Sequence, residues 1–528
     1  MQTIVERWKN IWFSSRCCFT IAAPLQPNLV AKALRPPPDL PLEIWLEIFQ
    51  FATYIHSHET LRPLDPFTPR RITTNVMGAN TPSLVMRTKL SIVLVSRAWR
   101  RIALQIFYRH IVIRSPARAR AILHVLEQSR QPTSASSDSE RSEIELDSPT
   151  TALPMGHGQW TRHIEVYTHM RGSADIRFLQ NIFKIFQCCP NLQFLSGKWN
   201  HQLPVEFLEG ISALYGTSLE GIFWADSMPQ LDYNTVATPE FIGSFHSVRT
   251  LDLRQFHGAD PVTRSSDAPR PTLPNVQELI VANSERSLVT ASILHLPKLN
   301  NLTIRTNGGA SGTNDHLIAF LKVHGHNLVS VDLPTPSDMD FDLDHAPVRR
   351  NAEFIPPDLF LQPDTCPNLE TLVYSCLAPN APTHSHPNLR RIGIRGMTAD
   401  FLYPDKASVT KDHLSALTVQ KYPRLEHVQM VGFLVESHGD SIMKDACIWW
   451  VEKFEKMGVL FLDGECVLWV YSEPEETQVE QMATTTKKQE TEIQVKSIGV
   501  EKTEKKLEEA KLKEQRPLEP PVAVIPAI

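Results

Sequence analysis

A short phrase recurs along the chain and constrains its fold more than any other feature. Its copies have the form x-Pro-x-Leu or x-Pro-x-Val and lie at 189–192, 273–276, 296–299, 366–369, 386–389 and 422–425. Apolar residues then recur three and five positions beyond the last residue of most copies, and related sets occur elsewhere. The sets are Leu219/Ile222/Trp224, Val248/Leu251/Leu253, Val276/Leu279/Val281, Leu299/Leu302/Ile304, Leu328/Val331/Leu333, Leu369/Leu372/Tyr374, Leu389/Ile392/Ile394 and Leu425/Val428/Met430. Alternate residues of a strand share one face, so each set predicts a turn followed by a short strand with one buried face.

The spacing of these sets favours a repeat architecture. The anchors lie about 20 to 40 residues apart, and intervening segments such as Asp175–Phe186 and Asp315–Val323 have helical spacing. A further copy begins at Leu192/Leu195 but is interrupted by Gly197. The pattern resembles a degenerate, irregular leucine-rich-repeat solenoid, which implies parallel strands on a concave sheet. An ordinary α/β domain whose buried strands begin after proline is the alternative.

The strand residues between the buried positions would face a ligand. They are polar and of mixed charge, which is typical of a protein-binding surface and equally of any exposed sheet face. The candidate substrate-binding residues are Thr250, Asp252, Arg254, Asn301, Thr303, Arg305, Ser330, Asp332, Arg391, Arg395, His427 and Gln429.

A second feature is the apolar segment Leu40–Phe49. Pro41 suits the first position of a helix, because that residue's N–H has no partner within the helix. The polar residues Glu43, Glu47 and Gln50 form one narrow stripe, and the other sides are apolar. Such a helix is either a fully buried core helix or the docking surface for a partner.

Landmarks further along the chain bear on this choice. Val95-Ser96-Arg97-Ala98-Trp99 is followed by Ile102-Ala103 and then by Tyr108-Arg109-His110-Ile111. With the Leu-Pro-x-Glu-Ile opening at Leu40, this order resembles the F-box, the three-helix adaptor-docking module of SCF-type ubiquitin ligases. The resemblance covers about residues 36–113. One departure is an insertion at 56–83 between the first two helices. A longer loop there costs little stability, because the entropic cost of closing a loop grows slowly with its length.

The resemblance implies a partner and a set of contacts. The partners would be a Skp-family adaptor with its cullin-RING ligase core and a protein substrate of unknown identity. The implied adaptor-binding residues are Leu40, Pro41, Glu43, Ile44, Ile48, Phe49, Leu94, Val95, Trp99 and Ile102. For Trp99, a place in the small domain's own core is an equally good interpretation, because Val95 and Ile102 share its helical face.

These features divide the chain of 528 residues into five parts. They are an N-terminal extension (1–35), the F-box-like domain (36–115, insertion 56–83), a helix and Ser/Asp-rich linker (116–158), the repeat domain with a C-terminal cap (159–472) and a Glu/Lys- and Pro-rich tail (473–528). We expect the linker to be disordered and the tail to be disordered or a single solvated helix, since both carry few large apolar residues. In the cap, 445–457 predicts a helix and 459–471 a strand, tight turn and strand.

Composition argues against several functions. The formal net charge of -5 gives no reason to expect nucleic acid or an anionic membrane as partner. The eight cysteines form no CxxC pair and are too sparse for a disulfide framework, which favours a reducing compartment, the cytoplasm or the nucleus. No phosphate-binding loop or His-Glu-x-x-His motif occurs. Gly439-Asp440-Ser441-Ile442 resembles the Gly-Asp-Ser-Leu nucleophile motif of a hydrolase family, but no histidine follows Ser441 to act as its base.

The sequence therefore predicts an α plus α/β protein that is not an enzyme and needs no cofactor or metal. The expected function is substrate recognition in ubiquitin-dependent protein degradation. The alternative is a leucine-rich-repeat interaction scaffold with no ligase role.

Overall fold

The structure is a computed structural model that describes thirteen stretches of the chain. They are residues 40–68, 81–130, 156–168, 175–201, 203–226, 237–256, 270–305, 314–334, 354–362, 364–397, 402–403, 408–435 and 441–470. Of these described residues, the ones up to Trp469 belong to one compact unit. The N-terminal extension, the Ser/Asp-rich part of the linker, residues 69–80 of the insertion, Gly439-Asp440 and the tail from Tyr471 lie outside the described residues.

The central element is one parallel sheet of twelve strands whose spatial order follows the chain. The strands are β1 (His110–Ile113), β2 (His163–Tyr167), β3 (Phe194–Trp199), β4 (Gly221–Asp226), β5 (Thr250–Asp252), β6 (Glu278–Ala282), β7 (Asn301–Arg305), β8 (Ser330–Asp332), β9 (Thr371–Ser375), β10 (Arg391–Arg395), β11 (His427–Met430) and β12 (Leu460–Leu462). Sequential parallel strands are what a solenoid produces, because each repeat adds one strand beside the last. The prediction of parallel strands is confirmed.

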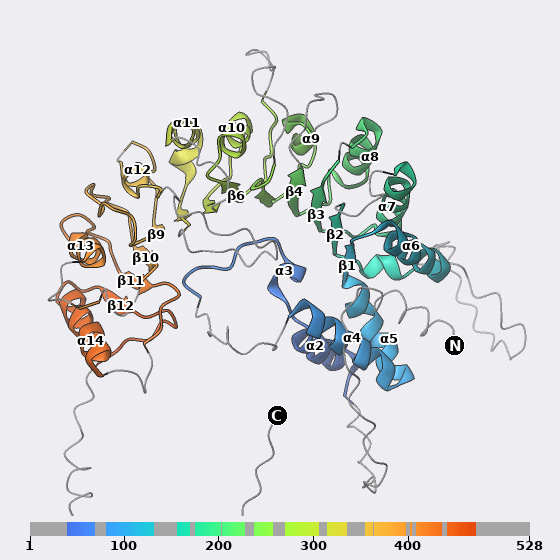
Figure 1. Ribbon diagram of the computed structural model, residues 1–528, viewed down its shortest axis with the longest axis horizontal. Helices are drawn as coiled ribbons and strands as arrows, with labels where there is room; N and C mark the ends of the chain where they lie inside the picture. Colours follow the sequence, from blue (N-terminus) through green and yellow to red (C-terminus); the bar gives the residue numbers. More distant parts are fainter. Residues whose placement is uncertain are drawn as a thin grey trace, which may run out of the picture. The chain divides into compact units, whose positions relative to one another are not determined.

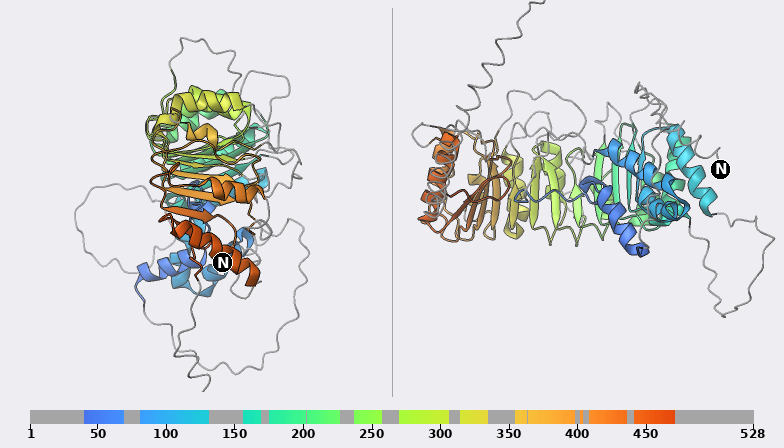
Figure 2. Two further views of the ribbon diagram at one scale, coloured as in Figure 1. Left: turned by 90° about the vertical axis from the view of Figure 1, so that its left-hand side faces the viewer. Right: turned by 90° about the horizontal axis from the view of Figure 1, so that it is seen from below.

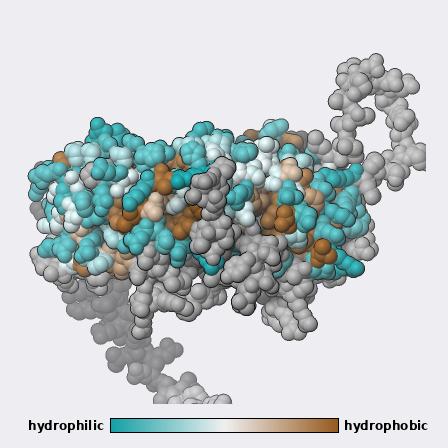
Figure 3. Space-filling model, turned by 90° about the horizontal axis from the view of Figure 1, so that it is seen from above, coloured by the Kyte–Doolittle hydropathy of each residue, from teal (hydrophilic) through white to brown (hydrophobic). Residues whose placement is uncertain are grey.

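Helices connect the strands and lie along the outer side of the curved sheet (Figures 1 and 2). They are α6 (Pro116–Arg130), α7 (Ile176–Cys188), α8 (Val205–Tyr215), α9 (Pro239–Gly243), α10 (Glu285–Ile293), α11 (Asn314–His324), α12 (Asp358–Leu361), α13 (Val409–Ala416) and α14 (Ser441–Glu455), with 3-10 turns at His157–Trp160 and Gly325–Asn327. The helices expected at 175–186, 315–323 and 445–457 are thus present with shifted ends. Figure 3 looks onto this outer side, which is mainly hydrophilic with dispersed hydrophobic groups.

The structure confirms which alternate residues of each predicted strand face the core. All members of the eight apolar sets are buried, and their strands align in register, for example Leu251 with Leu279 and Leu279 with Leu302. They form one continuous core with the apolar sides of the outer helices. The alternate residues of each strand therefore face the other side of the sheet, which we call the inner face.

The interrupted copy at Leu192/Leu195 is also a strand, β3. Gly197 takes a core-facing position there, and a Cβ at this residue would lie 2.3 Å from Nε1 of Trp199. The indole of Trp199 fills the space that a side chain at residue 197 would occupy, and it is itself buried. The sequence pattern breaks at Gly197 because Trp199 fills the core position in its place, and the repeat continues.

The N-terminal helices are α2 (Leu42–Ala52), α3 (His56–Glu59), α4 (Pro82–Val95) and α5 (Arg97–Arg109). Pro41 is the N-cap of α2, one position earlier than expected. Ser96 separates α4 from α5 and caps the latter, its Oγ accepting a hydrogen bond of 3.1 Å from the Trp99 N–H. Strand β1 follows α5 directly, so the sheet begins inside the range 36–115 that was expected to be a separate three-helix domain.

The C-terminal end of the sheet differs from the prediction. The segment after β12 turns at Asp463, but residues 465–470 form no strand, so the expected hairpin is wrong. The Asp463 carboxylate explains the turn, because its Oδ1 accepts hydrogen bonds from the N–H groups of Glu465 and Val467 and its Oδ2 one from the Trp469 indole. Strand β12 pairs instead in parallel with β11. Across the described residues, every helix is too short or too polar to cross a bilayer.

Candidate functional site

Helix α2 exposes a stripe of large apolar side chains. Ile44, Ile48 and Phe51 recur at intervals of four and three residues and are 41%, 43% and 85% exposed. Leu42, beside them, is also exposed. Residues at this spacing lie on one side of a helix, and three such anchors are what an amphipathic helix presents to a hydrophobic groove.

The other implied adaptor-binding residues divide into two groups. Leu40, Pro41, Glu43, Leu94 and Val95 are exposed, the last two at the end of α4. Those of the second group contribute to the core of the three helices.

Phe49 and Ile102 are buried, and Trp99 is half-buried against them. The ring centroids of Trp45 and Phe49 lie 4.9 and 4.8 Å from that of Trp99. These side chains hold α2 against α5, so in this conformation Phe49 and Ile102 have no surface to offer a partner.

The inner face of the sheet brings the candidate substrate-binding residues together. The parallel register places Thr250, Asn301, Ser330, Arg391 and His427 in one row and Asp252, Thr303, Asp332 and Gln429 in the next. Their exposure varies: Arg391 is exposed, whereas Thr250, Asp252, Thr303, Asp332, Arg395 and Gln429 are buried. The row that contains Arg391 is thus the better placed to meet a ligand.

Several charged residues of this face are paired with one another. Oδ2 of Asp332 accepts hydrogen bonds from Nη2 of Arg305 and from Nη2 of Arg395, both at 3.0 Å, and Oδ1 forms an ion pair with Nη2 of Arg395 at 2.9 Å. Asp252 forms an ion pair with Arg254 at 3.0 Å. Buried charges need such partners, so these residues first serve to satisfy each other.

The sequence did not single out a short segment that lies on the inner face. Residues 60–68, which we call the internal strap, follow α3 in the insertion and run along the inner side of the strands (Figures 1 and 2). Arg62 pairs with Glu278 of β6, and the Phe67 ring lies under the Arg391 guanidinium of β10. No periodic signal marks such a segment, because its contacts are irregular and far apart in the sequence.

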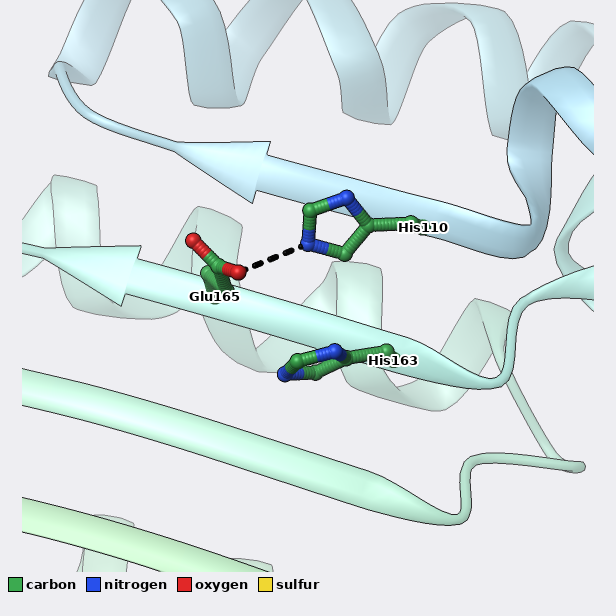
Figure 4. A group of neighbouring side chains, drawn as sticks. All are labelled: His110, His163 and Glu165. Atoms are coloured by element: carbon green, nitrogen blue, oxygen red, sulfur yellow. Dashed lines mark hydrogen bonds and ion pairs between the residues drawn. The ribbon is translucent and has the colours of Figure 1, made fainter. Parts of the chain in front are cut away.

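A polar cluster lies where the helices meet the sheet (Figure 4). Ligand atoms of His110, His163 and Glu165 lie within 4.8 Å of one another, a set of types that would suit Zn²⁺. However, His110 Nε2 is 2.9 Å from Glu165 Oε1, and His163 Nε2 shares a hydrogen bond with the Ser196 hydroxyl. Hydrogen bonds within the protein therefore account for the arrangement.

Burial and nearby cations keep His110 uncharged. The ring is fully enclosed, and Lys89, Arg114 and Arg118 add positive charge, so its pKa falls to about 3. Burial also lowers the pKa of other histidines in the described part of the chain, and that of His324 falls to about 4. The others are His157, His201, His386 and His413.

We expect the free energy of unfolding to fall as the pH is lowered from about 6.5 toward 4. In the unfolded chain these histidines bind protons near pH 6.5, whereas in the folded chain they stay neutral, so acid favours unfolding. Denaturant titrations at pH 7.5, 6 and 5 measure this. His110→Gln should show a smaller fall than the parent protein, while His246→Gln, at an exposed site, should match it. Equal falls in His110→Gln and the parent would contradict the assignment.

Comparison with known proteins gives no family. No protein-family model matches the sequence, and neither does any curated protein.

Proposed function

We propose that this protein is the substrate receptor of an SCF-type, cullin-RING ubiquitin ligase. Helices α2, α4 and α5 would form an F-box that docks to a Skp-family adaptor, and the strand-per-repeat sheet would be an irregular leucine-rich-repeat array that binds a protein substrate. The observation that carries the proposal is the exposed stripe Ile44, Ile48 and Phe51 on α2. It sits in a segment whose sequence landmarks resemble the F-box.

The two parts would act by proximity. The adaptor fixes the helices to the ligase core, and the helices continue directly into the sheet through β1. A substrate held on the sheet is then presented to the ubiquitin-charged partner at high effective concentration. No catalytic group of this chain takes part. The setting would be the cytoplasm or the nucleus.

The proposal predicts that Ile48→Asp weakens adaptor binding by at least about 30-fold, the loss expected for a central interface anchor of about 2 kcal/mol. The substitution places a charge in an apolar contact without touching the core, since Ile48 is 43% exposed. Calorimetric titration of the purified Skp-family adaptor into the full-length protein measures it. Combined Leu40→Ala and Pro41→Ala should also weaken binding.

Ile176→Asp on α7 is the matched control, because Ile176 is also an exposed isoleucine (63%) and lies outside the N-terminal helices. It should bind the adaptor as the parent does. If the parent protein binds no Skp-family adaptor, or if a folded Ile48→Asp variant binds normally, the ligase proposal is wrong. An interaction scaffold with no ligase role is then the remaining function.

A further inference from the structure

The internal strap is anchored at both ends. Before it, Glu59 of α3 pairs with Arg109 of α5 at 2.6 Å, and Nε2 of His56 is 2.8 Å from the Arg62 carbonyl oxygen. At its far end, the Phe67 carbonyl oxygen lies 3.1 Å from Sγ of Cys466, beyond the last strand. The strap therefore crosses the inner face from the helices toward the C-terminal end of the sheet.

Two side chains of the strap, those of Arg62 and Phe67, contact charged residues of the sheet. Nε of Arg62 is 2.6 Å from Oε1 of Glu278, and the Arg391 guanidinium carbon is 5.0 Å from the centre of the Phe67 ring. Arg62 and Phe67 are five positions apart and reach β6 and β10. A basic and an aromatic side chain at this separation thus match an acidic and a basic site on the inner face.

Two glycines of the sheet lie beside the strap, and their lack of a side chain leaves space there. Gly221 of β4 and Gly393 of β10 both face inward, in the rows opposite the core positions. A Cβ at Gly221 would lie 3.2 Å from Leu61 Cδ1, and one at Gly393 would lie 3.2 Å from Phe67 Cζ. Phe194 is closer still to the first position, and Val373 and Val431 to the second, so side chains of the strap and of the sheet together cover the backbone at these glycines.

The two partners of the Arg62–Glu278 ion pair differ in their exposure to solvent. The Arg62 side chain is 58% exposed, whereas that of Glu278 is 8% exposed. The Arg62 guanidinium is already largely in contact with water, so it returns to solvent at little desolvation cost. Glu278 needs a cation more, since burial raises the pKa of its carboxyl group and the Arg62 charge opposes that rise. The cost of separating the pair therefore falls mainly on Glu278, and a basic residue of another segment can offset that cost as well as Arg62 does.

We propose that the internal strap is a built-in competitor on the substrate-binding surface, and that this surface takes a peptide segment of the same chemistry from a partner protein. Such a segment carries a basic residue for Glu278 and, about five positions later, an aromatic residue for Arg391. The inference rests on the proposed function only in naming the partner a substrate. It restricts the substrate class and adds a regulatory step, because the strap must leave before the substrate binds.

The test uses a fluorescent peptide of residues 59–68 as the probe and the full-length protein without adaptor. The double variant Arg62→Ala, Phe67→Ala should bind the probe about tenfold more tightly than the parent, because a tethered copy competes at millimolar effective concentration. Leu64→Ala, at a strap residue that is 46% exposed, is the control and should bind as weakly as the parent. Adding Arg391→Ala to the double variant should abolish the gain.

Each other outcome overturns the proposal. If the double variant gains no affinity for the probe, or if it only lowers the denaturation midpoint of the protein, the strap is a fixed part of the structure that does not leave the sheet. If Arg391→Ala leaves the gain intact, the probe binds elsewhere. Since no adaptor is present, these results are independent of whether the protein joins a ubiquitin ligase, and failure of adaptor binding leaves this test unaffected.

Discussion

Asp332→Ala should lower the free energy of unfolding by about 3–5 kcal/mol, the cost of removing one partner from a buried ion pair. The Asp332 side chain is 6% exposed and accepts hydrogen bonds from both Arg305 and Arg395. Its removal leaves the buried Arg395 guanidinium without that carboxylate. Urea unfolding at pH 7.5, followed by tryptophan fluorescence, measures the change.

Two further variants separate charge pairing from other effects. Asp364→Ala removes an exposed aspartate and should change the stability by no more than about 0.5 kcal/mol. Adding Arg395→Met to Asp332→Ala replaces the buried guanidinium by an apolar side chain and should restore part of the loss, because an apolar side chain tolerates burial. If Asp332→Ala costs no more than Asp364→Ala, the pair contributes nothing and the inner face is more hydrated than its contacts imply.

The repeat was predictable because its signal is local. Alternation of apolar residues such as Leu251 and Leu253 follows from strand geometry alone, and a turn phrase before six of the strands indicates where they begin. The parallel order then follows from stacking one similar unit on the next. Strands β1 and β2 lack the phrase and were not predicted, although they belong to the same sheet.

The inner face was less predictable because its contacts are not local. Arg395 is 63 positions from Asp332, and Phe67 is 399 positions from Cys466. Strand register places both Arg391 and Asp332 on the inner face. Arg391 is exposed there and can contact a ligand, whereas Asp332 is buried in an ion pair. Periodicity distinguishes the two faces of a strand, but not what covers each face.

The same limit applies to α2 and leads to the second large effect. Phe49→Ala should lower the free energy of unfolding by about 3–5 kcal/mol, because it empties an aromatic site in the small core shared with Trp99 and Ile102. Phe51→Ala on the same helix should change stability by no more than about 0.5 kcal/mol, because that ring is 85% exposed. The F-box resemblance names Phe49 as an adaptor contact and does not name Phe51, whereas the structure buries Phe49 and exposes Phe51.

Hydrogen exchange followed by mass spectrometry measures both variants by segment. In Phe49→Ala, the amides of α2 and α5 should lose protection while those of β6 to β10 keep it, because the large core of the sheet does not include Phe49. Phe51→Ala should keep protection everywhere and, in the adaptor titration, bind more weakly than the parent. Equal loss of protection in the two variants would mean that the exposed stripe of α2 is part of the core, and the docking surface would then have to lie elsewhere on the helices.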